Sequence, residues 1–201
     1  ALTHIGATVY APTRKEMDLT EQSSVRQYLS DTQPRMVIHA AAACGGIGAN
    51  VANPGLFLHA NALMGLLLLE EARLNQVQTF VLISTTCAYP KNAPMPLVES
   101  TIWDGAPTGA TGPYGMAKRL LHEAIASYQA QYGLKGVVLL PANLYGPGDH
   151  FDPENSHVVA AMIRRYVEAN DTNASSITHW GTGSPTREFL HVDDAVRGIL
   201  L

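Results

Sequence analysis

Met36-Val-Ile-His-Ala-Ala-Ala-Ala43 is an apolar run of strand length that lacks the polar alternation of a half-exposed strand. Such a run is typical of a parallel strand covered by helices on both faces. A long helix is expected next over Leu56–Asn75, with Pro54 near its start, and Phe80-Val-Leu-Ile-Ser84 is a second buried strand. The order strand, helix, strand favours a parallel α/β sheet.

The same alternation continues on both sides of this unit. The further expected elements are a strand over Ala7–Ala11, a helix over Ser23–Ser30, a helix over Tyr114–Tyr132 and a strand over Gly136–Pro141. Together they predict a doubly wound, Rossmann-type parallel sheet, in which ligands bind beyond the carboxyl ends of the strands. Those ends fall at residues 39–44, 84–87 and 141–145.

The regular alternation stops at Gly146-Pro147-Gly148. A loop, a helix from about His157 to Ala169 and a polar stretch to Ser176 follow. We therefore expect a sheet domain over residues 1–148 and part of a smaller region over residues 149–201.

One motif of dinucleotide-binding sheets is missing from the sequence. Such sheets begin with a strand and a G-x-G-x-x-G turn that receives the pyrophosphate. Cys44-Gly-Gly-Ile-Gly48 follows the wrong strand and lacks this spacing, and the sequence ends inside a helix-like segment, Val192–Leu201. We expect a chain truncated at both ends that lacks its first βα unit. The alternative is a complete, small flavodoxin-like domain.

Composition excludes several classes of function. The 201 residues are 46% hydrophobic and carry a net charge of −4, which argues against general attraction to nucleic acid or to an anionic membrane. No apolar run is expected to reach membrane-spanning length, and no signal peptide opens the sequence, so a cytoplasmic protein is expected. Cys44, Cys87 and the eight histidines form no disulfide framework and no recognisable metal site.

Tyr114-Gly-Met-Ala-Lys118 places a phenol and an ammonium on one face of the expected helix, about one turn apart. A nearby ammonium favours the phenolate, so we expect the pKa of Tyr114 to fall towards neutrality, where proton transfer is efficient. Taken alone, the pair could equally be an aromatic and a cation on an exposed helix face.

A wider pattern surrounds this pair. Thr85 stands 29 residues before Tyr114, where a buried strand breaks into a loop. This arrangement, with Asn61-Ala-Leu-Met-Gly65 and Arg187–Asp194, resembles the extended short-chain dehydrogenase/reductase family. Within it, the GDP-L-fucose synthase subfamily is the most similar. The segments that carry this likeness are Gly45-Gly-Ile47, Cys87–Lys91, Asn143–Pro147, Ser156-His-Val158 and Trp180–Gly183.

The resemblance implies an NADPH-dependent enzyme that acts on a GDP-sugar, GDP-4-keto-6-deoxymannose, by epimerising C3 and C5 and reducing the C4 ketone. It implies that Cys87 and His157 exchange the α-protons, in an order that the sequence leaves open. Thr85 and Tyr114 would stabilise the enolate oxygen. Tyr114 would then protonate the oxygen at C4, while Lys118 lowers its pKa and holds the nicotinamide ribose.

Cofactor and substrate contacts are also implied by the resemblance. Arg14 suits the 2′-phosphate and favours NADPH over NADH, although it could equally be a solvated loop charge. The other implied NADP(H) contacts are Asp18, Leu19, Ala40, Ala41, Ala42, Ile83, Ser84, Thr85, Lys118, Pro141, Asn143, Leu144 and His157. The implied contacts to the GDP-sugar are Asn143, Val158, Arg165, Trp180 and Arg187. Residues 1–148 would thus bind the cofactor and residues 149–201 part of the substrate, in a homodimer formed through the two long helices.

Several alternatives stay open at this point. Cys87 could be a small buried side chain, His157 an ordinary histidine and Trp180 a core residue. The subfamily usually has Lys-Val before Gly-Gly-Ile, where this chain has Ala43-Cys44, and a serine where it has Thr85. Other functions considered are a nucleotide-sugar epimerase or dehydratase that recycles NAD, and a nucleotide-binding module without catalysis.

Overall fold

The structure, a computed structural model, describes residues 2–153, 156–179, 181–184 and 186–201. Its centre is a parallel sheet of three strands in the order β1 (Met36–His39), β2 (Thr79–Ile83) and β3 (Lys135–Leu139). Val81 of β2 pairs with Ile38 on one side and with Val137 on the other. The predicted parallel α/β sheet is confirmed.

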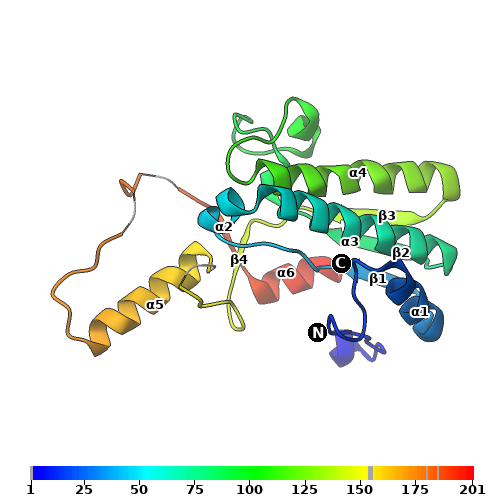
Figure 1. Ribbon diagram of the computed structural model, residues 1–201, viewed down its shortest axis with the longest axis horizontal. Helices are drawn as coiled ribbons and strands as arrows, with labels where there is room; N and C mark the ends of the chain where they lie inside the picture. The colour runs from blue at the N-terminus through cyan, green and yellow to red at the C-terminus, as the bar shows by residue number, and fades with distance from the viewer. Residues whose placement is uncertain (1, 154–155, 180, 185) are drawn as a thin grey trace.

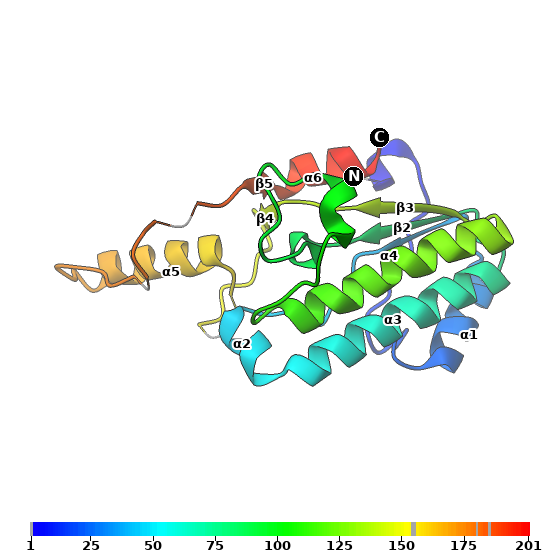
Figure 2. The same ribbon diagram turned by 90° about the horizontal axis from the view of Figure 1, so that it is seen from above.

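Two long helices, α3 (Pro54–Leu74) and α4 (Gly112–Tyr132), lie side by side over one face of this sheet (Figures 1 and 2). Helix α6 (Val192–Ile199) and the N-terminal segment lie over the opposite face (Figure 2). The main core forms between the sheet, the two long helices and α1 (Gln22–Thr32). Its buried side chains include Val25, Leu29, Leu68, Leu69, Ala72, Phe80, Leu82, Leu121 and Ile125.

The long helices pack closely because Gly65 has no side chain. A Cβ at this position would lie 2.2 Å from Cδ1 of Leu121, so the glycine of the Asn61–Gly65 motif lets α3 approach α4. Helix α3 is long and apolar enough, by length and composition, to cross a membrane, contrary to our expectation. One face of this helix lies in the core, with Leu69 and Ala72 almost completely buried, while Leu56, Leu58 and Leu74 are exposed.

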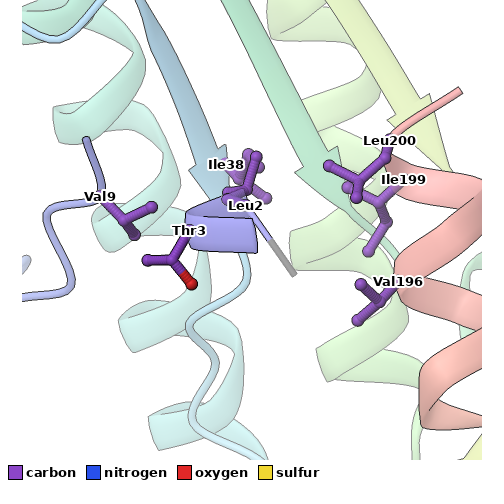
Figure 3. Close-up of a pocket in the computed structure, with 7 residues that line it drawn as sticks. All are labelled: Leu2, Thr3, Val9, Ile38, Val196, Ile199 and Leu200. Atoms are coloured by element: carbon purple, nitrogen blue, oxygen red, sulfur yellow. The ribbon is translucent and has the colours of Figure 1, made fainter. Parts of the chain in front are cut away.

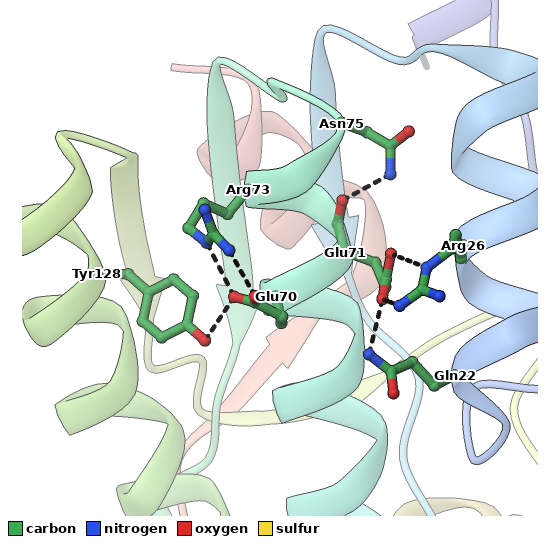
Figure 4. A network of polar contacts seen from close by, with 7 residues as sticks. All are labelled: Gln22, Arg26, Glu70, Glu71, Arg73, Asn75 and Tyr128. Atoms are coloured by element: carbon green, nitrogen blue, oxygen red, sulfur yellow. Dashed lines mark hydrogen bonds and ion pairs between the residues drawn. The ribbon is translucent and has the colours of Figure 1, made fainter.

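A polar network on α3 ties this helix to both of its neighbours (Figure 4). The carboxylate of Glu71 accepts hydrogen bonds from Arg26 Nη2 and Gln22 Nε2 of α1, both at 2.8 Å. Next to it, Glu70 accepts from Arg73 and from the hydroxyl of Tyr128 on α4. Glu71 has no exposed side-chain surface, and the guanidinium of Arg26 holds the pKa of this carboxyl below its ordinary value.

Two strand predictions differ from the structure. Strand β1 ends at His39 instead of Ala43. The amide of Asn61 accepts from the Ala43 N–H at 3.0 Å and donates to its carbonyl at 2.8 Å, so the backbone of Ala43 is bonded to α3 and not to a strand. Residues 7–11 form no strand, and no neighbouring strand pairs with them in the described part of the chain.

Several short elements were not predicted from the sequence. They are the 3₁₀ helices η1 (Leu2–Ile5), η2 (Thr86–Ala88) and η3 (Glu99–Trp103), helix α2 (Ile47–Ala52), and strands β4 (Asn143–Tyr145) and β5 (Phe189–His191). Strands β4 and β5 pair in parallel, which joins residues on both sides of the expected boundary at 148/149. The expected helix near residue 157 is α5 (Val158–Asp171), which projects away from the sheet (Figure 1).

An apolar pocket of about 300 Å³ lies beside β1, between the N-terminal segment and α6 (Figure 3). It is lined by Leu2, Thr3, Val9, Ile38, Val196, Ile199 and Leu200. None of these side chains carries a charge, and all but Thr3 are aliphatic, so the pocket suits an apolar group. The side chains with nucleophilic or titratable groups that could take part in a reaction lie elsewhere, at the carboxyl ends of the strands.

The Glu71 network should matter more for stability than the Glu70 network on the same helix. We expect Arg26→Leu to lower Tm by about 5 °C or more, because it leaves a carboxylate buried without its cation. Arg73→Leu is the matched control, since Glu70 is partly exposed and should lose only about 1–2 °C. Thermal unfolding followed by circular dichroism measures both. Equal losses would show that burial of Glu71 is unimportant.

Candidate active site

Helix α4 holds the loop that follows β2 through three consecutive contacts. The ammonium of Lys118 donates to the carbonyl of Ile83 at 3.0 Å, and Arg119 donates to the carbonyl of Ala88 through Nε at 3.0 Å. One turn earlier, a Cβ on Gly115 would lie 2.0 Å from the carbonyl oxygen of Cys87. The backbones can meet there only because residue 115 is glycine. The loop from Ile83 to Ala88 is therefore fixed against the helix that carries Tyr114.

Thr85 is the N-cap of the 3₁₀ helix η2. Its Oγ1 accepts the N–H of Cys87 at 3.2 Å and so caps this short helix. The cap places the Cys87 thiol half-buried just beyond the strand. Tyr114 is close enough for the thiols of Cys87 and Cys44 to influence its ionisation. The structure therefore brings together four of the five expected catalytic residues: Thr85, Cys87, Tyr114 and Lys118.

The ionisation of Tyr114 differs from the expectation. Burial raises the pKa of its hydroxyl well above the ordinary value, and the thiols of Cys44 and Cys87 raise it further. The expected lowering by Lys118 is wrong for this structure, because the ammonium of Lys118 is directed to the Ile83 carbonyl. The phenol is thus protonated at neutral pH and can donate a hydrogen bond.

Lys118 is the unusual cation of the site, with only 2% of its surface exposed. Burial lowers its pKa to about 8, while Cys44 opposes this shift. Within the described part of the chain, one of its three Nζ donors has a hydrogen-bond partner, the Ile83 carbonyl. A buried ammonium with unused donors is suited to bind neutral hydroxyl groups of a ligand.

Two further histidines are buried His39 and half-buried His122. His39 ends β1, is 2% exposed, and its Nδ1 has no hydrogen-bond partner among the described residues. His122 lies one turn after Lys118, and its Nε2 is 2.6 Å from Oγ of Ser84. Burial is the main cause that lowers both pKa values to about 4, so both rings are neutral at pH 7. We had assigned neither of them a role from the sequence.

Several of the expected cofactor contacts lie at the carboxyl ends of β1 and β2. Ala40, Ala41 and Ala42 follow β1 as a stretch of small side chains, held in place by the contact between Asn61 and Ala43. The contacts at the end of β2 are Ile83, Ser84 and Thr85, together with Lys118 of α4.

Arg14 is 82% exposed, and its Nε lies 3.2 Å from the carboxylate of Asp18. Leu19 packs against the main core. The backbone and the side-chain amide of Asn143 donate to the Glu188 carbonyl, while Pro141 and Leu144 flank it before and within β4.

The remaining expected contacts are not gathered at the loop. His157 is the N-cap of α5, is exposed, and within the described residues forms no hydrogen bond or ion pair with Cys87 or Tyr114. Val158 and Arg165 also lie on α5, which projects away in both views (Figures 1 and 2). Arg187 is exposed and donates to the Thr186 carbonyl at 2.7 Å. Trp180 lies outside the described residues.

Comparison with known proteins shows the family of this chain. The sequence profile of the NAD dependent epimerase/dehydratase family matches residues 1–201, the whole chain. The chain belongs to this family. It is similar to "Probable GDP-L-fucose synthase 1" of Oryza sativa subsp. japonica, with 40% identity over 201 residues, 99% of this chain and 61% of that protein. It is also similar to the GDP-L-fucose synthase of Escherichia coli K12, with 38% identity over 182 residues, 90% of this chain and 57% of that protein.

A solved structure agrees with these relatives. The chain superposes with a TM-score of 0.86 on a GDP-L-fucose synthetase from Naegleria fowleri bound to NADP, at 26% identity, covering 99% of this chain and 66% of that one. The expected Rossmann-type fold and the resemblance to GDP-L-fucose synthases are thereby confirmed. The chain spans about three fifths of the length of the curated relatives named above.

The contact between Gly115 and Cys87 gives a mutational prediction. Gly115→Ala should lower the free energy of unfolding by about 3 kcal/mol, because its Cβ collides with backbone that cannot rotate away. Gly48→Ala is the control, since nothing lies within 4 Å of its added Cβ, and it should leave stability unchanged or slightly raised. Urea unfolding measures both. A tolerated Gly115→Ala would contradict the close approach of α4 and the loop.

The lowered pKa values of His39 and His122 predict a pH dependence of stability. Between pH 6.5 and 4 these two histidines bind protons in the unfolded chain, while in the folded state His39 and His122 stay neutral. The free energy of unfolding therefore falls as the pH falls. His39→Phe should reduce the slope by about one proton. His59→Phe, at an exposed position of α3, should leave it unchanged. Urea unfolding between pH 4.5 and 7 gives the slopes, and an unaltered slope in His39→Phe would refute this account.

Proposed function

We propose that this chain belongs to an enzyme that converts GDP-4-keto-6-deoxy-D-mannose into GDP-L-fucose, by epimerisation at C3 and C5 and reduction at C4 with NADPH. The observation that carries the proposal is the placement of Thr85, Cys87, Tyr114 and Lys118 around one loop at the carboxyl end of β2. Relatives of this chain bear the name GDP-L-fucose synthase, which supports the same reaction.

The residues present suit NADP(H). The buried ammonium of Lys118 keeps donors for the ribose hydroxyls, and the small side chains of Ala40 and Ala41 let a flat ring lie against the backbone. The guanidinium of Arg14 is exposed and pairs with Asp18 through Nε, and it would bind a 2′-phosphate in the proposed complex. NADPH, when bound, supplies the hydride for C4. The NADP-bound relative supports this choice of cofactor.

Epimerisation needs a base that removes the proton beside the C4 ketone and an acid that returns one on the opposite face. Cys87 is half-buried next to Tyr114 and suits one of these roles, and His157 at the start of α5 suits the other. During this step negative charge develops on the C4 oxygen. The hydroxyls of Tyr114 and Thr85 are the donors that would stabilise it.

Reduction uses the same hydroxyl in a second role. Tyr114 is protonated at neutral pH, as a free tyrosine is, so it holds the proton that the C4 oxygen receives as the ketone becomes an alcohol. Its raised pKa makes the phenol a weaker acid, so the proton leaves only as the strongly basic alkoxide forms at C4.

The substrate region would include Asn143, Val158, Arg165, Trp180 and Arg187, with the arginines bound to the diphosphate. We also propose a cytoplasmic homodimer. The outer faces of α3 and α4 carry exposed apolar side chains, among them Leu58 at 40%, Met116 at 41% and Leu120 at 44% exposure. Such a pair of apolar helix faces fits a two-fold contact between subunits.

The overall reaction has a direct isotopic test. In deuterated water, the full-length protein should consume NADPH with GDP-4-keto-6-deoxy-D-mannose and deliver deuterium to C3 and C5 of the product, because both protons are exchanged. Mass spectrometry and NMR of the product measure this. Reduction without deuterium at both carbons would remove epimerisation from the proposal. Activity without net consumption of NADPH would favour an epimerase that recycles NAD, and cofactor binding without turnover would favour a binding module.

The thiol of Cys87 has a separate test. Cys87→Ser should slow deuterium exchange at C3 and C5 by about 100-fold, since a hydroxyl is a much weaker base and acid near neutral pH. NADPH binding, followed by fluorescence, should stay unchanged. Cys44→Ser is the matched control, because Cys44 is exposed on the neighbouring loop. If Cys87→Ser exchanges at the normal rate, the thiol has only a packing role.

A further inference from the structure

The contacts between α4 and the loop continue one turn beyond Lys118. Nε2 of His122 lies 2.6 Å from the hydroxyl oxygen of Ser84. Ser84 is 5% exposed, and its backbone N–H donates to the Leu139 carbonyl of β3 at 2.8 Å. This residue stands between Ile83, whose carbonyl receives the ammonium, and Thr85, whose hydroxyl caps η2. The histidine therefore binds the loop at its second residue.

We propose that His122 is a positioning residue, which acts through Ser84 to hold the Ile83 carbonyl against Lys118. The inference rests on the proposed function, because it concerns the site of that reaction. Lys118 and His122 are four residues apart on α4, so they lie on one face and bind consecutive residues of the strand end.

The burial of Ser84 makes this contact consequential. A buried hydroxyl needs a hydrogen-bond partner, and the imidazole of His122 provides it. With the side chain and the backbone N–H both bonded, the peptide group that joins Ile83 to Ser84 has a fixed orientation. The Ile83 carbonyl belongs to this peptide group and therefore points steadily at the ammonium. Loss of the imidazole would free the strand end on the side of α4.

The charges around Lys118 indicate what such freedom would change. The titratable groups that influence or face its ammonium are His39 from β1, Cys44 from the following loop and His122 from α4 itself. Both histidines are neutral at pH 7, so neither adds a charge next to the ammonium of Lys118. Burial is the main cause that keeps the pKa of Lys118 low. A loosened strand end admits water to the ammonium, and its pKa should then rise towards the ordinary value.

The test compares His122→Leu with His122→Gln and a control, His59→Leu, whose side chain is exposed on α3. The full-length protein carries lysine labelled with ¹³C at Cε, and Lys118→Met assigns the resonance. Without substrate, His122→Leu should raise the pKa of Lys118 from about 8 by about one unit. His122→Gln can still bond Ser84 and should shift it less, and His59→Leu should not shift it.

Activity gives the second readout. His122→Leu should lower kcat about tenfold, with its pH profile displaced in step with the pKa of Lys118, while KM for the GDP-sugar changes less than about twofold. An unchanged pKa of Lys118 in folded His122→Leu would overturn the proposal. If that variant does not fold, Ser84→Ala removes the same hydrogen bond and must raise the pKa instead. Absence of reductase activity in the unaltered protein would refute the proposed function alone, because the lysine titration needs no substrate.

Discussion

The buried ammonium of Lys118, directed at the carbonyl of Ile83, is the interaction on which the rest of the site depends. It requires that α4 lie directly against the end of β2, which in turn requires a glycine at residue 115. It also requires that α3 lie close behind α4, which Gly65 permits. The polar network of Glu70 and Glu71 then fixes α3 between α4 and α1. The packing of the helices, the backbone contact at Gly115 and the buried charge of Lys118 thus together fix the loop that follows β2.

That geometry sets the protonation of the site before any ligand is bound. Burial favours the neutral form of Tyr114, His39 and His122, and it weakens the preference of Lys118 for its proton. A site of this kind presents a protonated phenol to an oxygen that gains negative charge. Tyr114 would therefore hold the proton for the proposed reduction without a phenolate in the resting protein.

Much of this could be predicted from the sequence because each signal is local. Apolar runs without alternation predicted β1 and β2, and the spacing of Tyr114 and Lys118 predicted their shared helix face. The early end of β1 could not be predicted, since the backbone of Ala43 is bonded to Asn61, which is distant in the sequence. The same holds for the pKa of Tyr114, which is raised mainly because tertiary packing buries the hydroxyl. The pairing of Ser84 with His122 had only a weak signal, a histidine four residues after Lys118 on the same face.

The most direct measurement is a crystal structure of the full-length protein with NADP and a non-reactive GDP-sugar. We expect Lys118 to keep its hydrogen bond to the Ile83 carbonyl while its remaining donors contact the ribose, with the Tyr114 hydroxyl and the Cys87 thiol both facing the sugar ring. A structure in which Lys118 leaves the Ile83 carbonyl, or in which Cys87 faces away from the sugar, would contradict the account.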